Sequence, residues 1–227
     1  AQNGDGLDLE SCKNVLLQDC SLDVGDDAIC IKSGRDKEGR DRGMPTENVI
    51  VTNCRVYHGH GGFVIGSEMS GGARNIWVNK CQFIGTDCGL RFKSTRGRGG
   101  VVEHIYVDQV GMANIPGDAI VFDLYYAGAN AGNNKAEAHP VDETTPSFRD
   151  IHIRDIVCNG AARAAYINGL PEMPVKDVDI SHSVFSSREG IILNRVDGIT
   201  LKGLQIHTEQ GEGITQKDLV KNVKVIK

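Results

Sequence analysis

The chain has 227 residues, 28 glycines, six prolines and a formal net charge of −5 at neutral pH. This charge argues against a surface built as a whole for nucleic acid or another polyanion, but allows a local basic pocket. The apolar runs are far shorter than the roughly 18 residues of a membrane-spanning helix. Many short strands between glycine-rich turns, without a capped helical pattern, predict an all-β protein.

A repeated series of short apolar strands runs along the chain. Its members begin at Val15, Val49, Ile76, Ile105, Ile151, Val178, Ile199 and Val223. A second series lies 13 residues after each of the first six, at Ala28, Gly62, Gly89, Asp118, Ala164 and Ile191. The offset between the two series is constant, whereas the rest of each coil varies in length. This pattern is typical of a β-solenoid, in which insertions collect on one loop-bearing face. We therefore expect the strand starts of each series to stack in columns.

Two insertions interrupt the repeat. Residues 35–42 have mixed charge and are expected to form a solvated loop. Residues 128–146 are the longest insertion, and a lid or wall there would block one end of a cleft. Because no coil precedes the first strand, we expect residues 1–227 to be one solenoid domain, the carboxy-terminal portion of a longer protein that lacks its amino-terminal coils here.

The seven cysteines have no metal-type or disulfide-type spacing. Cys20, Cys54 and Cys81 each follow a strand start by five residues, which predicts an inward-facing ladder of free thiols. Neither a metal nor a cofactor is predicted.

Acidic residues gather at the corner before the second series. Asp5 directly precedes one short apolar strand, and Asp26 and Asp27, 21 residues later, precede the next. Residues one coil apart stack about 4.7–4.9 Å from each other. Neighbouring carboxylates push their pKa values apart, as acid–base chemistry on a glycosidic bond requires. For an inverting acid–base pair we expect roughly 6.5–9.5 Å between the carboxyl groups.

The following coils add other polar groups at the same corner. His60 falls one coil beyond the aspartates, and Arg91 and Lys93 one coil further on. Side chains at positions i and i+2 of a strand share a face, so these two cations project together. Tyr125 and Tyr126 follow in the next coil. A cation pair beside acids suits a sugar that itself carries a carboxylate.

These motifs resemble a known family. NGDG, GDD, GHGG and RFK, at residues 3–6, 25–27, 59–62 and 91–93, resemble in order and spacing the four signature motifs of the polygalacturonase family, glycoside hydrolase family 28. The resemblance implies a right-handed parallel β-helix and hydrolysis of α-1,4-linked galacturonosyl bonds in pectin with inversion. Residues 66–72 and 93–100 are most similar to the bacterial exo-acting branch.

Two motifs depart from the family pattern. The usual Asn-Thr-Asp-Gly is Asn-Gly-Asp-Gly here, and the usual Arg-Ile-Lys is Arg-Phe-Lys. Neither departure removes a functional group.

The resemblance also implies roles for the acids. Asp26 is implied as the general acid, and Asp5 and Asp27 as the carboxylates that activate the attacking water. His60 is implied to hydrogen-bond near the acid and to hold its protonation state. The residues alone leave open which aspartate is acid and which is base, because the pKa values of a coupled cluster belong to the set.

Three further residues are implied to bind the substrate. Arg91 and Lys93 are implied to bind galacturonate carboxylates around the cleavage point, and Tyr126, rather than Tyr125, to contact the sugar. The partner is then polygalacturonate or a related pectic oligosaccharide. We expect no nucleic-acid or membrane partner, a monomer, and a secreted or periplasmic location.

Two alternatives stay open. A polysaccharide lyase on the same architecture would need calcium held by carboxylates and a basic residue that abstracts a proton. A non-catalytic β-helix, either an adhesin or an inactive fragment, would use the same coils without chemistry. The sequence also leaves open which pectic polymer is the substrate.

Overall fold

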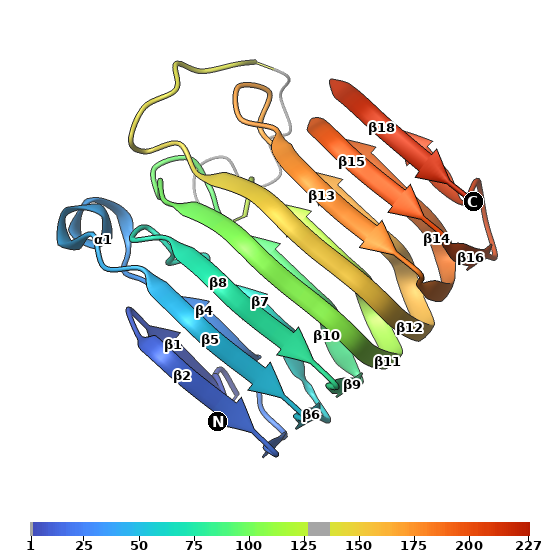
Figure 1. The fold of residues 1–227 in the computed structure, drawn as a ribbon, viewed down its shortest axis with the longest axis horizontal. Coiled ribbons are helices and arrows are strands. Elements are labelled where there is room, and N and C mark those ends of the chain that lie inside the picture. Colours follow the sequence, from blue (N-terminus) through green and yellow to red (C-terminus); the bar gives the residue numbers. More distant parts are fainter. Residues whose placement is uncertain (1, 127–136) are drawn as a thin grey trace.

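The chain winds into a parallel β-helix in the computed structural model, which describes residues 2–126 and 137–227 (Figure 1). Strands from successive coils lie side by side from the blue end to the red end of the ribbon. The pairings between the first, middle and last strands are all parallel. The predicted parallel β-helix is therefore confirmed.

Each coil contributes strands to three strips of parallel sheet. Strip A contains β2 (Lys13–Gln18), β5 (Thr46–Thr52), β8 (Ala73–Asn79), β13 (Val175–Ser181), β15 (Val196–Lys202) and β18 (Val220–Ile226). Strip B contains β3 (Ser21–Leu22), β6 (Arg55–Val56), β9 (Gln82–Ile84) and β16 (Gln205–Thr208). Strip C contains β1 (Leu7–Glu10), β4 (Asp27–Lys32), β7 (Gly59–Ile65), β10 (Thr86–Lys93) and β17 (Ile214–Gln216). Three longer strands bend through more than one strip, β11 (Val101–Asp123), β12 (Ser147–Asn168) and β14 (Val184–Asn194).

The first predicted series is one unbroken column on strip A. Val15 pairs with Val49, Val49 with Ile76, and the register continues in the same way to Val223. Most of these side chains point inward and are fully buried. Because side chains alternate between the two faces of a strand, this register fixes which residues form the core.

The second predicted series is wrong at two of its six positions. The column that contains Ala28, Gly62, Gly89 and Ala164 continues through Ala119 rather than Asp118 and through Gly190 rather than Ile191. The register shifts between Ile115 and Asp118, and again between Asn159 and Ala161. A bulge at such a corner changes the number of residues between the two strand starts by one. A constant 13-residue offset therefore predicts the wrong residue after a bulge.

Residues in the left-handed conformation turn the corners of the coil. One column on strip A has positive φ in successive coils and includes Asn14, Asn48, Asn75 and Asp150. Asparagine and aspartate tolerate this conformation better than other non-glycine residues. The Asn48 Nδ2 also donates to the Asn14 Oδ1 at 3.0 Å, and the Asn75 Nδ2 to the Asn48 Oδ1 at 3.3 Å. The side chains of these asparagines therefore link successive coils in a hydrogen-bonded ladder.

The mixed-charge insertion is not a loop but contains the helix α1 (Asp36–Arg42). Gly43 ends the helix in the left-handed conformation, and its N–H donates to the Gly39 carbonyl. The Arg40 Nη1 donates to the carbonyls of Gly97 and Arg98 at 2.7 and 3.1 Å. Polar contacts hold this helix against a neighbouring coil, so it lacks the apolar stripe by which a sequence reveals a helix.

The predicted cysteine ladder is confirmed. The carbonyls of Cys20, Cys54 and Cys81 each accept a hydrogen bond from the coil above, from Arg55, Gln82 and Gly111. All seven cysteines are free, and Cys54 and Cys81 are buried. Burial raises the pKa of the Cys81 thiol to about 12. These thiols therefore act as small apolar side chains.

Only part of the long insertion can be placed. Residues 127–136 lie outside the described residues, so the expected lid stays a prediction. The Thr144 carbonyl accepts hydrogen bonds from Gly97 N at 3.0 Å and Gly99 N at 2.8 Å. The segment 137–146 is thus fastened to the loop that follows β10. No helix in residues 2–126 and 137–227 has the length and apolarity needed to cross a membrane.

Stacked phenylalanines provide a test of the core. Phe92 and Phe122 stack with ring centroids 4.3 Å apart, and Phe148 packs edge-on against both. Phe92→Ala should lower the free energy of unfolding by about 3–5 kcal/mol, because it leaves a cavity among rigid strands. Urea unfolding of the full chain measures this loss. Tyr57→Ala, at a side chain that is 40% exposed, is the control, and an equal loss in both variants would contradict the predicted core.

Candidate active site

The candidate site lies on strip C, where several turns enter their strands. Asp5 lies in the turn before β1, and Asp26 lies immediately before Asp27, the first residue of β4. Backbone hydrogen bonds hold these turns together, from Gly6 N to the Asp27 carbonyl at 2.9 Å and from Asp26 N to the Gly4 carbonyl at 3.1 Å. The two acidic motifs are therefore neighbours because the coils that carry them are hydrogen-bonded.

The three predicted acids converge. Asp5, Asp26 and Asp27 each place one carboxylate oxygen within 4.8 Å of the others. The expected separation of roughly 6.5–9.5 Å refers to whole carboxyl groups rather than to their nearest oxygens, so it stays a prediction. The three side chains differ in exposure, at 21% for Asp5, 28% for Asp26 and 3% for Asp27. Such close carboxylates repel one another unless nearby cations compensate them.

Lysines supply that compensation on both sides of the cluster. The Lys93 Nζ lies 2.6 Å from the Asp27 Oδ2, and the Arg91 Nη1 lies 3.5 Å from the Asp27 Oδ1. The Lys32 Nζ lies 2.8 Å from the Asp5 Oδ2. Within the described residues, Asp26 has neither a lysine nor an arginine in ion-pair contact. The charge of the Asp26 carboxylate is thus the least compensated of the three.

His60 lies directly beside Asp26. Its Nδ1 is 3.0 Å from the Asp26 Oδ1, and its backbone N–H donates to the Asp26 carbonyl at 2.8 Å. On its other side, the Nε2 lies 3.9 Å from the Asp87 Oδ2. The ring is about half exposed, so it also faces solvent. His60, which the sequence predicts to lie beside the aspartates, is therefore in contact with Asp26.

Arg91 and Lys93 project together, as expected for positions i and i+2 of β10. Both lie over the Tyr126 ring, with the Arg91 Cζ 5.1 Å and the Lys93 Nζ 4.6 Å from its centroid. Tyr125 is buried and faces other residues, with the arginines Arg96 and Arg195 over its ring. The structure thus places Tyr126, and not Tyr125, with the two cations.

The two cations are not equally available to a ligand. Lys93 is 7% exposed and its ammonium group already donates to Asp27, whereas Arg91 is 21% exposed and its contact with Asp27 is longer. A ligand carboxylate could reach the Arg91 guanidinium without breaking a short hydrogen bond, because the contact of Arg91 with Asp27 is 3.5 Å long. For Lys93 the ligand would have to share the ammonium with Asp27.

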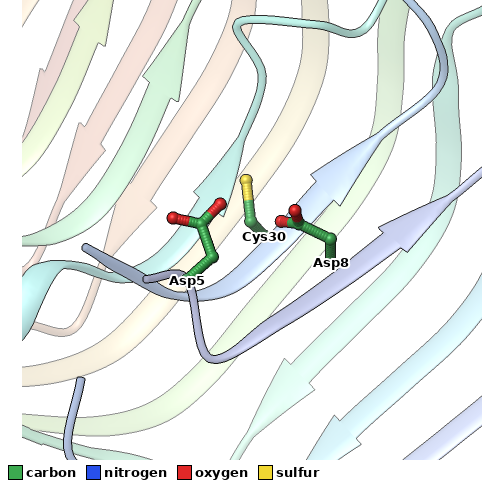
Figure 2. A group of neighbouring side chains, drawn as sticks. All are labelled: Asp5, Asp8 and Cys30. Atoms are coloured by element: carbon green, nitrogen blue, oxygen red, sulfur yellow. The ribbon is translucent and has the colours of Figure 1, made fainter. Parts of the chain in front are cut away.

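Sequence reasoning missed Asp8 and Lys32. The Lys32 Nζ lies 2.9 Å from the Asp8 Oδ2, so one ammonium group bridges Asp5 and Asp8. Figure 2 shows the Asp5 and Asp8 carboxylates on either side of the Cys30 thiol. A signal was present, because Asp8 pairs with Cys30, and Glu10 with Lys32, in the register of β1 and β4. These outward positions follow from strand alternation once the register is known.

Sequence reasoning also missed Asp123, which pairs with Lys93 across β10 and β11. Its Oδ1 accepts the Tyr125 N–H at 3.0 Å and faces the Asn168 Nδ2 at 3.4 Å. Burial raises the pKa of this carboxyl group, and these hydrogen bonds only partly oppose it. Asp123 therefore orders the turn that leads to Tyr126.

The Lys32 bridge has a clear effect on proton affinity. Burial alone would raise the pKa of Asp5, but the hydrogen bonds from Lys32 and Asp8 outweigh it and hold the pKa below its ordinary value. For Asp8, burial and the neighbouring Asp5 outweigh Lys32, so its pKa is raised. Burial disfavours the charged form of Lys32, yet its hydrogen bonds to Asp5 and Asp8 raise its pKa above the ordinary value.

Two groups of side chains in the described part of the chain have the spacing of metal ligands. They are Asp5, Asp8 and Cys30, and Asp5, Asp26 and Asp27. In both groups lysine or arginine nitrogens already compensate the carboxylates. Burial also raises the pKa of the Cys30 thiol, which keeps it protonated. We therefore assign no metal to either group.

Comparison with known proteins is consistent with this geometry. The family model described as glycosyl hydrolases family 28 matches residues 1–187. The "Probable polygalacturonase" of Vitis vinifera is 31% identical over 181 residues, which cover 79% of this chain and 35% of that protein.

Solved structures give the same picture. A hyperthermoactive exopolygalacturonase from Thermotoga maritima has a TM-score of 0.72 at 32% identity, over 94% of this chain and 44% of that one. A family 28 exopolygalacturonase from Yersinia enterocolitica has a TM-score of 0.82 over 99% of this chain and 38% of that one; at 18% identity it shows the fold alone. The chain spans less than half the length of these relatives.

The buried Asp27–Lys93 pair yields a testable coupling. Lys93→Met should lower the free energy of unfolding by about 3–5 kcal/mol, because it leaves a buried carboxylate without its ammonium partner. Adding Asp27→Asn should restore part of the loss, and a double-mutant cycle in urea measures the coupling. Lys13→Met, in an exposed pair with Glu47, is the control and should leave the unfolding midpoint unchanged. Additive effects of Lys93→Met and Asp27→Asn would show that the two groups are not coupled.

Proposed function

Because the chain belongs to glycosyl hydrolases family 28, we propose that it carries the catalytic face of an enzyme that hydrolyses α-1,4-linked galacturonosyl bonds in pectin. The observation that carries this proposal is the cluster of three carboxylates within 4.8 Å, with a cation pair and a tyrosine beside it. A carboxylate cluster performs acid–base chemistry on a glycosidic bond, and the cations match the carboxylates of a uronic acid polymer.

Asp26 is the general acid in this proposal. It is the member of the cluster without a lysine or arginine contact among the described residues, and the family resemblance implies this role. A protonated Asp26 transfers its proton to the glycosidic oxygen as the bond to the sugar breaks. His60, 3.0 Å from the Asp26 Oδ1, orients the acid and stabilises the carboxylate that it leaves behind.

Asp5 and Asp27 are the base carboxylates. Asp5 contacts the ammonium group of Lys32, and Asp27 that of Lys93. Hydrogen bonds with Lys32 and Asp8 hold the pKa of Asp5 below its ordinary value, which favours the ionised form that can accept a proton. A water molecule between them and the sugar loses its proton to one carboxylate and attacks the anomeric carbon. Arg91 and Tyr126, with the shared ammonium of Lys93, bind the substrate beside the bond that breaks.

The stereochemical outcome rests on the family resemblance rather than on the carboxylate spacing. We propose inversion, in which water attacks the face opposite the leaving group in one displacement. Proton NMR of the first product tests it, because inversion of an α-linkage releases the β-anomer before mutarotation. An initial α-anomer would contradict inversion.

The proposed mode of action is supported by the likeness to the exopolygalacturonase from Thermotoga maritima and by the length of the insertion in the sequence. We propose release of units from a chain end, which the size distribution of products from defined oligogalacturonides tests. A single β-helix domain over residues 1–227, a monomeric state, and a secreted or periplasmic location stay predictions.

A lyase is the second candidate, because the acids have the spacing of metal ligands. Lys32, Lys93 and Arg91 already compensate these carboxylates, which favours hydrolysis. Hydrolysis should produce new reducing ends in the presence of a chelator, without the ultraviolet absorbance of an unsaturated sugar. A chelator-sensitive, unsaturated product would instead identify a lyase, and no product at all would favour a non-catalytic β-helix.

The acid assignment has a direct test. Asp26→Asn should abolish most turnover of polygalacturonate, because the amide cannot deliver a proton to the leaving oxygen. Circular dichroism and the unfolding midpoint should stay those of the parent, since Asp26 is partly exposed. Near-parental turnover in this variant would rule out Asp26 as the acid.

Recognition of acidic sugar is tested at Arg91. Arg91→Met removes a charge-assisted contact worth about 1.5–3 kcal/mol, so kcat/KM on oligogalacturonides should fall about tenfold to a hundredfold. The loss should be smaller on methyl-esterified chains, which have no carboxylate to bind. Arg74→Met is the control, at an arginine on strip A that pairs with Glu47, and its kcat/KM should equal that of the parent. An equal loss on charged and esterified substrates would show that Arg91 does not recognise the carboxylate.

A further inference from the structure

The Lys32 bridge carries an inference that rests on the proposed function and goes one step further. We propose that Lys32 and Asp8 form a positioning device for Asp5, in which the shared ammonium group bridges the two carboxylates and holds Asp5 at the carboxylate cluster. Lys32 acts through Asp5 and is not itself a catalytic residue.

Geometry is the first support. Lys32 is the last residue of β4, and its Nζ lies 2.8 Å from the Asp5 Oδ2 and 2.9 Å from the Asp8 Oδ2. Both distances are those of charge-assisted hydrogen bonds. The Lys32 side chain is 19% exposed, so solvent screens these contacts only in part. A single ammonium group thus fixes the position of a turn residue, Asp5, relative to two strands.

The unequal environments of the two carboxylates are the second support. Asp5 is 21% exposed and Asp8 is 40% exposed, and each contacts the same ammonium group. The pKa of Asp5 is held below its ordinary value, because its hydrogen bonds outweigh burial, whereas burial and Asp5 raise the pKa of Asp8. As pH falls, Asp8 is therefore protonated before Asp5, and Asp5 stays a carboxylate that can accept a proton from water.

Among residues 2–126 and 137–227, the groups that face Asp5 come from β1, from β4 and from the turn before β4. Asp8 faces it from β1, and Lys32 and Cys30 from β4. Asp26 and Asp27 face it from the turn that enters β4. Cys30 is kept neutral, because burial raises the pKa of its thiol.

The cations of the next coils contact other members of the cluster. His60 on β7 contacts Asp26, and Arg91 and Lys93 on β10 contact Asp27. Among residues 2–126 and 137–227, Lys32 is thus the one lysine or arginine in ion-pair contact with Asp5. If the charge of Lys32 is removed, no other lysine or arginine of the described residues replaces it beside Asp5.

The experiment compares the pH dependence of kcat/KM on oligogalacturonides for the parent, Lys32→Met, Lys32→Arg and Asp8→Asn. In the parent, the acidic limb reports protonation of the base. Lys32→Met removes the cation, so this limb should move to higher pH by about 1–2 units, with KM little changed. Lys32→Arg restores the charge and should bring the limb back towards the parent.

Asp8→Asn should leave the same limb close to its parental position. Asp8 is already protonated where Asp5 titrates, so a neutral amide replaces a neutral carboxyl group and the ammonium group of Lys32 stays beside Asp5. A purely structural role for the bridge would weaken Lys32→Met and Asp8→Asn alike, without a shift of the limb that is specific to Lys32→Met. Lys13→Met, at a lysine on strip A, is the control and should keep the parental profile.

A second measurement does not depend on turnover. Carbon-13 NMR of the aspartate side-chain carboxyl carbons in the full chain gives the pKa of Asp5, assigned by its loss in Asp5→Asn. The Asp5 pKa should rise in Lys32→Met and stay close to its parental value in Asp8→Asn. If the parent does not hydrolyse pectic substrates, the proposed function fails while this titration still decides the role of Lys32.

Three outcomes would overturn the inference: an unchanged Asp5 pKa in folded Lys32→Met, an acidic limb of Lys32→Met that stays in place, or an equal upward shift in Lys32→Met and Asp8→Asn. If Lys32→Met does not fold, Lys32→Gln and Asp8→Asn decide the question by the same titration.

Discussion

The in-register stacking of parallel coils is the constraint on which the rest of the structure depends. Strand alternation and a spacing of about 4.8 Å between coils place side chains from distant parts of the sequence within contact distance. Asp27 and Lys93 are 66 residues apart in sequence and yet form a 2.6 Å pair, because their strands are only two coils apart in space. The same in-register stacking produces both the core column from Val15 to Val223 and the acidic cluster.

That stacking imposes an electrostatic problem which the lysines solve. Three carboxylates with oxygens within 4.8 Å would repel strongly in a partly buried site. Lys32 compensates Asp5, and Lys93 compensates Asp27. Among the described residues, the ion-pair partner of Asp26 is His60. The two lysines thus stabilise the corner of the coil, and Lys32 also helps to hold the pKa of Asp5 below its ordinary value.

The site is divided between rigid and adaptable parts. The acids, His60 and the two cations stand on strip C or on the turns that enter it, where backbone hydrogen bonds to both neighbouring coils restrict movement. The segments around them, α1, the residues after β10 and residues 137–146, are held mainly by polar contacts such as those of Arg40 and Gly97. Variation in these segments can change access to the site without changing the positions of the acids.

The sequence by itself determined what depends on local periodicity. The strand starts, the cysteine ladder and the neighbours Asp26 and His60 follow from a repeat whose side chains alternate and whose coils stack. Only the tertiary structure decided how the charges pair, because long side chains such as Lys32 and Lys93 can reach any of several carboxylates. It also decided the one-residue shifts near Asp118 and Ile191 and the helix α1, since a bulge or a polar docking contact depends on the neighbouring coil and leaves no periodic trace.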